Sequence, residues 1–201
     1  MDSSDLPARP SAQCRDEVNY EEKEATLTVR SIGIISKPKK GLLERVIPTL
    51  LEWLAQRGIQ ARMDEESAKT LDDALRSSLT IPVVSRSELA AQSDMILVLG
   101  GDGTLLAAAR NVLNRNIPVL AVNLGGLGFL TAVTIDELYS TLELVLEGKH
   151  QIEQRKMLQI EVIRSGSIVA TYHALNDAVL NKAAIARILD FQAFVDRKSV
   201  V

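Results

Sequence analysis

The chain has 201 residues, of which 46% are hydrophobic, and this is enough for one well-packed domain with part of a second. Its net charge of -3 gives no basic surface for nucleic acid, and no segment is apolar enough to span a membrane, so we expect small-molecule partners. With Cys14 as its one cysteine, the chain forms no internal disulfide. Because His150 and His173 are its only histidines, we also expect no metal cluster. Without a targeting signal, we expect a cytoplasmic protein.

Three regions follow one another along the chain. Residues 1–28 are polar and lack hydrophobic periodicity, which predicts a disordered arm. Residues 29–148 alternate apolar strands with amphipathic helices, as in an α/β domain with a doubly wound, mostly parallel, Rossmann-like sheet. In residues 149–201 the apolar residues recur with period two, which predicts the start of a β-rich, β-sandwich-like second domain.

The first half of the α/β region gives six predicted elements in chain order: a strand over 27–36, a helix ending at Gly58, a strand over 59–63, a helix over 67–78, a short helix over 89–92 and a strand over 95–99. Pro48 lies inside the first helix, so we expect either a kink there or a helix that starts near Pro48.

The strand over 95–99 runs directly into the loop Gly100-Gly101-Asp102-Gly103-Thr104, and a helix follows. Glycine permits positive φ and leaves the main chain bare, so that successive N–H groups at a helix N-terminus can bind an anion. We interpret residues 100–104 as a phosphate-binding loop. The alternative is an ordinary tight turn, because Asp-Gly is a common turn dipeptide.

A second glycine-rich loop, residues 123–131, follows the next predicted strand, residues 118–122, at the same edge of the sheet. Phe129 in this loop offers a flat ring to a purine or nicotinamide, and core packing is an equal alternative. Thr134 and Glu137 form a capping box for the next helix, which ends at Gly148.

The β-rich region begins with a hairpin, in which strands over 158–162 and 168–172 flank the turn 165–167. A third strand over 175–180 carries Asn176 and Asp177, which taken alone indicate a turn. A fourth strand is expected over 187–195.

Taken together, these motifs resemble the NAD kinase family, whose members phosphorylate the adenosine ribose 2′-hydroxyl of NAD to give NADP. Residues 100–104 alone are shared with diacylglycerol and sphingosine kinases and, as a variant, with phosphofructokinases, whereas the loop 123–131 is more particular to NAD kinases. The stretches 154–158 and 174–177 follow in the order of the family. The resemblance covers residues 30–196 approximately.

The resemblance implies that Asp102 is the catalytic proton acceptor and that Asp102 and Gly103 contact the dinucleotide. It implies nucleoside contacts for Asn176 and Asp177, and a contact to the bound nucleotide for Arg187. The loop chemistry adds four candidate binding residues: Gly100, Gly101, Thr104 and Phe129. An aspartate with a pKa near 3.9 is a poor base towards a hydroxyl, so we expect Asp102 mainly to orient it.

The resemblance also implies NAD and ATP as substrates and Mg²⁺ as a cofactor bound with ATP, mostly through phosphate oxygens and water, without a metal site made by protein groups alone. We expect the full-length protein to form a homo-oligomer. Two alternatives stay open: a lipid or sugar kinase with the same loop at 100–104, or a non-catalytic nucleotide-binding module. The phosphoryl acceptor distinguishes the first alternative, and the second would bind ATP or NAD without forming NADP.

The family continues with further strands and a Thr-Pro-Thr-Gly-Ser-Thr-Ala-Tyr stretch, which this chain lacks. Residues 196–201 read Asp-Arg-Lys-Ser-Val-Val, the translation of a common sequencing adapter. We therefore expect an inactive N-terminal fragment, with residues 197–201 as an artefactual tail.

Overall fold

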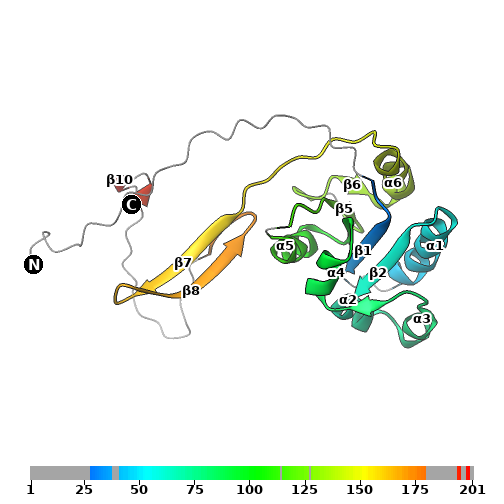
Figure 1. Ribbon diagram of the computed structural model, residues 1–201, viewed down its shortest axis with the longest axis horizontal. Helices are drawn as coiled ribbons and strands as arrows, with labels where there is room; N and C mark the ends of the chain where they lie inside the picture. Colours follow the sequence, from blue (N-terminus) through cyan, green and yellow to red (C-terminus); the bar gives the residue numbers. More distant parts are fainter. Residues whose placement is uncertain are drawn as a thin grey trace, which may run out of the picture.

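The computed structural model describes residues 28–37, 41–113, 115–126 and 128–179, together with the backbone of 194–195 and 198–199. Its centre is a six-stranded sheet of order β3-β2-β1-β4-β5-β6 in which every neighbouring pair is parallel (Figure 1). The strands are β1 (Ser31–Ser36), β2 (Gln60–Asp64), β3 (Val83–Val84), β4 (Met95–Leu99), β5 (Val119–Asn123) and β6 (Val133–Thr134). The predicted doubly wound α/β fold is confirmed for this part of the chain.

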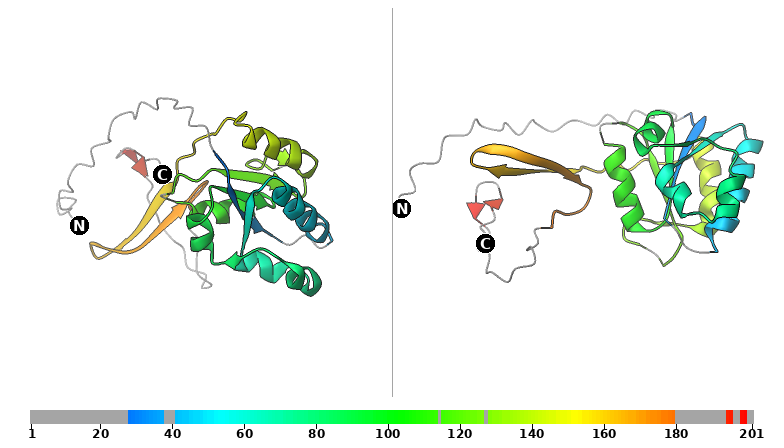
Figure 2. Two further views of the ribbon diagram at one scale, coloured as in Figure 1. Left: turned by 45° about the vertical axis from the view of Figure 1, so that its right-hand side comes forward. Right: turned by 90° about the horizontal axis from the view of Figure 1, so that it is seen from below.

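Helices cover both faces of the sheet (Figure 2). They are α1 (Leu43–Gln56), α2 (Glu65–Thr70), α3 (Asp73–Ser78), α4 (Arg86–Ala91), α5 (Asp102–Asn111) and α6 (Leu138–Leu146), with a 3-10 turn at Ile135–Glu137. Successive side chains of a strand point to opposite faces, so Ile34 packs in the core beneath α1 and α6 while Ile35 packs against α4 and α5. Strand β4 is buried along its whole length between these two layers.

The order of the strands reverses between β1 and β4, which pair from Ile32 opposite Met95 to Ser36 opposite Leu99. The connections after these two strands run to opposite faces of the sheet, α1 on one and α5 on the other. Such a reversal opens a crevice at the carboxyl ends of the two strands, where open α/β sheets bind their ligands.

A layer of aromatic and charged side chains joins α1 to α6. The guanidinium carbon of Arg57 lies 3.8 Å from the centre of the Trp53 ring, and Trp53 is tilted against Tyr139 with ring centroids 5.6 Å apart. Arg57 also forms an ion pair of 2.9 Å with Glu143 on α6. These contacts fix the two helices to each other on the face of the sheet opposite α5.

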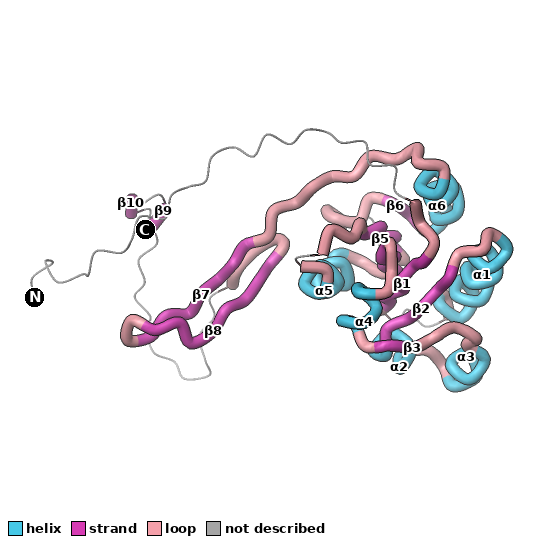
Figure 3. The backbone as a smooth tube through the Cα atoms, in the orientation of Figure 1, coloured by secondary structure: helices cyan, strands magenta, loops and turns pink. Residues whose placement is uncertain are grey.

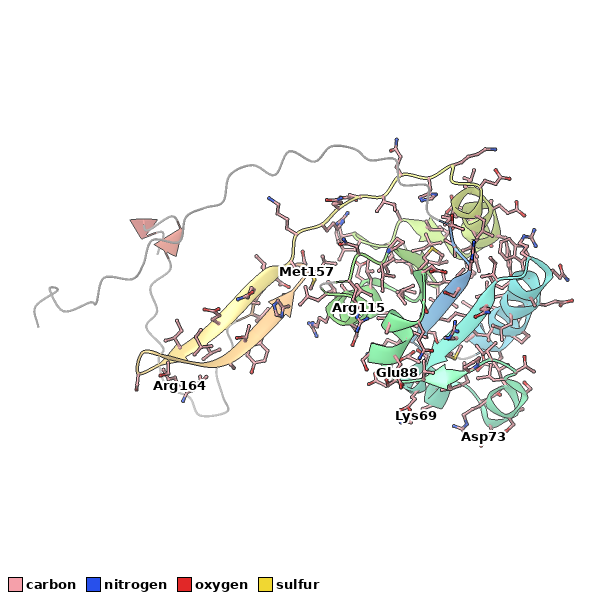
Figure 4. All side chains as sticks on the ribbon, viewed as in Figure 1. Lys69, Asp73, Glu88, Arg115, Met157 and Arg164 are labelled. Carbon is pink, nitrogen blue, oxygen red and sulfur yellow. The ribbon has the colours of Figure 1, made fainter. Side chains whose placement is uncertain are left out.

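The second region begins as predicted, with an antiparallel hairpin of β7 (Leu158–Arg164) and β8 (Ser167–Ala174). The hairpin reaches away from the α/β domain, which the tube drawing also shows (Figure 3). Met157 lies where the hairpin meets the domain, and Arg164 lies at its far end (Figure 4). Large apolar side chains on this hairpin are exposed, namely Leu158, Ile163, Ile168, Val169 and Tyr172. A short antiparallel pair, β9 (Phe194–Val195) with β10 (Lys198–Ser199), follows.

Several expectations are corrected by the structure. The helix expected over 67–78 is two helices, α2 and α3, because Asp72 interrupts it and its side chain accepts a hydrogen bond from Leu75 N as a new N-cap. Helix α1 begins at Leu43 and contains Pro48, so a start near Pro48 is wrong.

The strand expected over 175–180 is absent from residues 175–179, and residue 180 lies outside the described part. Of the strand expected over 187–195, only the backbone of 194–195 is described, and the arm 1–27 is outside the described residues. Within the described part of the chain, none of the helices has both the length and the apolar character needed to cross a bilayer.

Candidate functional site

The loop 100–104 leaves the sheet at the reversal of strand order. Gly100 N donates to Val122 O of β5 at 2.9 Å, and Lys37 N, just past β1, donates to Leu99 O at 3.2 Å. The loop is thereby anchored among the carboxyl ends of β1, β4 and β5. Helix α5 starts at Asp102 with Gly101 as an N-cap that has no side chain, so the first-turn amides are not covered by a capping group.

Close packing explains Gly100, and none of Gly100, Gly101 and Gly103 has a positive φ. A Cβ on Gly100 would lie 2.4 Å from Thr104 Oγ1, so the turn leaves no room for a side chain there. The Thr104 side chain itself is buried beneath the loop. An added Cβ on Gly103 would meet nothing within 4 Å, so neither crowding nor a positive φ requires glycine there, and its backbone is simply bare.

The carboxylate of Asp102 is held by the second glycine-rich loop. Its Oδ2 accepts from Phe129 N at 3.0 Å. Its Oδ1 accepts from Leu130 N at 3.2 Å, from Thr131 N at 3.2 Å and from Thr131 Oγ1 at 3.0 Å. The two loops predicted at one edge of the sheet are therefore joined through a single carboxylate.

Asn123, at the end of β5, organises the second loop from within. Its Nδ2 donates to Gly126 O at 2.7 Å and to Thr131 Oγ1 at 2.9 Å, while its Oδ1 accepts from Gly125 N at 2.8 Å. Gly128 completes the contact, because a Cβ there would lie 2.2 Å from Asp102 Oδ1. The loop can close onto the carboxylate only because residue 128 is glycine.

These contacts set the acidity of Asp102. Partial burial is the largest single influence and raises its pKa, but the hydrogen bonds from Leu130, Thr131 and Phe129 together outweigh burial and lower the pKa below its ordinary value. Asp102 is thus held as a carboxylate. It is a hydrogen-bond acceptor for a hydroxyl rather than a strong base.

The described residues contain no group of three His, Cys, Asp or Glu side chains arranged to hold a metal ion. Asp102 is already engaged by four donors. The described side chains at this edge therefore do not make a metal site of their own, and a divalent cation here would need ligands from phosphate oxygens and water.

The remaining candidate residues lie around this edge or outside the described part. Phe129 is fully exposed, with a relative accessibility of 101%, so its ring is not packed in the core. Asn176 and Asp177 are exposed and follow β8, a strand that contacts α5 and whose carboxyl end points towards it (Figure 1). Arg187 lies outside the described residues.

Sequence reasoning missed Asn123 and Thr131 as individual site residues, although both belong to the loop 123–131. Thr131 contacts Asp102, which lies 29 residues earlier in the sequence, and Asn123 acts through Thr131. The available signal was the presence of polar residues at both ends of a glycine-rich loop.

Comparison with known proteins agrees with this geometry. Residues 32–150 match the family model of the ATP-NAD kinase N-terminal domain. The chain is 46% identical over 172 residues to an NAD kinase of Solibacter usitatus, covering 86% of this chain and 58% of the relative. It is 45% identical over 168 residues to an NAD kinase of a Geobacter species, covering 84% and 57%.

The chain thus spans less than two thirds of the length of these curated relatives. Among solved structures, a crystal structure of yeast NADH kinase complexed with NADH is similar in fold, with a TM-score of 0.59 at 21% identity, over 74% of this chain and 47% of the other.

Proposed function

Because this chain belongs to the ATP-NAD kinase family, we propose that the full-length product of its gene transfers the γ-phosphoryl group of ATP to the adenosine ribose 2′-hydroxyl of NAD. The 2′-oxygen forms a bond to the γ-phosphorus while the bond from that phosphorus to the β–γ bridging oxygen breaks. The products are NADP and ADP, and the hydroxyl proton passes to Asp102.

The observation that carries this proposal is the position of Asp102. It is the first residue of α5, at the reversal of strand order, and its carboxylate is fixed by the loop 123–131. Phosphoryl transfer depends mainly on positioning and on stabilising charge, so a fixed acceptor beside bare helix amides suits this reaction. In this proposal the bare backbone of Gly101 and Gly103 lines the phosphate side, while Gly100 and Thr104, whose N–H groups donate to Val122 O and Gly101 O, shape the turn.

The lowered pKa of Asp102 defines its part in the reaction. A weak base does not remove a proton from a free ribose hydroxyl, but it orients the hydroxyl and receives its proton once attack on phosphorus has acidified it. Mg²⁺ bound through the ATP phosphates would neutralise their charge.

The nucleoside side of the site is proposed from exposure and from the resemblance. The uncovered ring of Phe129 is available to stack on a flat base. Asn176 and Asp177 would bind nucleoside hydroxyls, as carboxylates do in dinucleotide sites, and Arg187 would contact the nucleotide. We further propose residues 1–28, 29–148 and 149–201 as arm, catalytic α/β domain and β-rich region, and a cytoplasmic homo-oligomer for the full-length protein.

The test is an assay of the full-length protein with NAD or NADH as acceptor and with ATP or polyphosphate as donor, in which NADP(H) is quantified by an NADP-specific dehydrogenase. Diacylglycerol and fructose 6-phosphate serve as rival acceptors. We expect phosphorylation of the dinucleotide alone. Phosphate in the lipid or the sugar, or nucleotide binding without any NADP(H), would overturn the proposal.

A further inference from the structure

We propose that Asn123 and Thr131 form a positioning relay for Asp102, which saturates one carboxylate oxygen, Oδ1, and leaves Oδ2 to receive the substrate hydroxyl. The inference rests on the proposed function for the identity of that hydroxyl. The relay itself is defined by hydrogen bonds within the chain.

The direction of every hydrogen bond in the relay is determined. Asn123 Oδ1 accepts from Gly125 N, and Nδ2 donates to Gly126 O, so two backbone partners fix which end of the amide faces Thr131. Asn123 Nδ2 therefore donates to Thr131 Oγ1. A threonine hydroxyl has one proton, and with Asn123 as its donor this proton is directed to Asp102 Oδ1.

Burial separates the relay from solvent while Asp102 remains accessible. Thr131 is 0% exposed and Asn123 is 5% exposed, whereas Asp102 is only partly buried. Hydrogen bonds are stronger and more directional in such an environment. The orientation of Asp102 is thus set from the buried side, and its other side faces the edge of the sheet where ligands bind.

The two oxygens of Asp102 are unequal in consequence. Oδ1 accepts three hydrogen bonds, from Leu130 N, Thr131 N and Thr131 Oγ1, which exhausts its lone pairs. Oδ2 accepts one, from Phe129 N. Oδ2 is the oxygen with capacity for a hydroxyl, and the relay determines how far and at what angle that oxygen is presented.

The test compares Thr131→Val, which keeps the shape of the side chain but removes the hydroxyl, with Thr131→Ser, which restores the hydroxyl. Thr134→Val is the matched control, because Thr134 Oγ1 donates to Glu137 and not to Asp102. Two properties are measured on the full-length protein: the pH profile of NADP formation, and the titration of the Asp102 carboxyl by ¹³C NMR, assigned with Asp102→Asn. The NMR titration needs no turnover.

For Thr131→Val we expect kcat at neutral pH to fall about ten- to a hundredfold, as for a small displacement of a reacting group. The acid limb of the profile and the NMR titration of Asp102 should both move to higher pH, because one donor to the carboxylate is lost. Thr131→Ser and Thr134→Val should behave as the native protein.

The proposal is overturned if the Asp102 carboxyl of Thr131→Val titrates as in the native protein. It is also overturned if kcat falls as much in Thr131→Ser as in Thr131→Val. Should Thr131→Val fail to fold, Asn123→Ala is measured in the same way, and unfolding of both would show that the pair serves the fold alone. Failure of the native protein to form NADP would instead refute the proposed function, while the NMR titration would still decide the relay.

Discussion

At the scale of single residues, Asp102 joins the two glycine-rich loops and is the acceptor in the proposed reaction. Asp102→Asn removes the charge and turns one oxygen into a donor that faces backbone N–H groups of residues 129–131. We expect the fold to remain and turnover to fall about 10² to 10⁴-fold, the usual contribution of a positioned acid or base. Steady-state kinetics and thermal unfolding measure this, and near-native turnover would remove Asp102 from the mechanism.

The structure separates the effect of a Gly103 substitution on the fold from its effect on ATP binding. Its φ is not positive and an added Cβ meets no atom within 4 Å, so Gly103→Val should fold with an unchanged melting temperature. The new side chain would cover the first-turn amides of α5, and we expect ATP to bind at least about tenfold more weakly. Calorimetric titration with ATP measures this. If the folded variant binds ATP with native affinity, residues 100–104 are an ordinary turn and not a phosphate-binding loop.

Asp102 could be predicted as a site residue from the sequence, because a glycine-rich turn between a buried strand and a helix is a local pattern. The hydrogen bonds that fix its carboxylate depend on contact between loops that follow different strands, and no local pattern reports such a contact. The reason for glycine at 103 could not be predicted either, since glycine in a sequence does not distinguish a positive φ from a need for space or for a bare main chain.

At the scale of the elements, Pro48 in α1 is the clearest local conflict. It lies five residues after the first helical residue, Leu43, where proline removes an N–H from the helix ladder. Pro48 is exposed, so Pro48→Ala should raise the free energy of unfolding by about 1 to 3 kcal/mol. Urea unfolding measures the change, and a loss of stability would mean that the proline ring makes a packing contact that outweighs its cost to the helix.

Asp94 ties the start of β4 to the start of β1, since its Oδ2 accepts from Arg30 N at 2.9 Å, Ser31 N at 2.8 Å and Ser31 Oγ at 2.8 Å. Desolvation, the largest single influence, raises its pKa, but these bonds and the charge of Arg30 together lower the pKa.

A lowered pKa in the folded state gives stability that is complete above the unfolded value near 3.9 and is lost as the pH falls through the folded value. Asp94→Asn should therefore lower the melting temperature at pH 7, and the difference from the native protein should shrink as the pH falls below about 4. Thermal unfolding between neutral and acidic pH checks this. A difference independent of pH would assign the effect to packing.

The elements that sequence reasoning found are those with several apolar residues in phase. Strand β4 and the hairpin β7–β8 belong to this class. Strands β3 and β6 have two residues each, too few for any period, and they form only because a longer parallel strand lies beside them. The division between α2 and α3 depends on the side chain of one residue, Asp72, which a hydrophobic pattern does not register.

At the scale of the whole molecule, the hairpin differs from the α/β domain in how little of it is covered. Ile168 is 57% exposed and Tyr172 is 60% exposed, and because a β-bulge shifts the register between them, the two lie on opposite sides of β8. Uncovered apolar strands pair with other chains, so we expect the chain as printed to self-associate and to form no NADP. Ile168→Lys combined with Tyr172→Lys should reduce the apparent mass in size-exclusion chromatography with light scattering.

Thr171→Lys is the matched control for this prediction, because it places the same kind of charge on β8 without removing an apolar side chain. We expect it to reduce self-association less than the double variant does. A monodisperse native chain of 201 residues that makes NADP would contradict both parts of the prediction.

The contacts between α1 and α6 give the molecule an optical reporter of its own. Trp53 is the chain's single tryptophan, and it lies between Arg57 and Tyr139 on the face of the sheet opposite α5. Its emission therefore arises from one indole whose surroundings change when the two helices separate. Intrinsic fluorescence of the unliganded protein therefore follows the contact between α1 and α6.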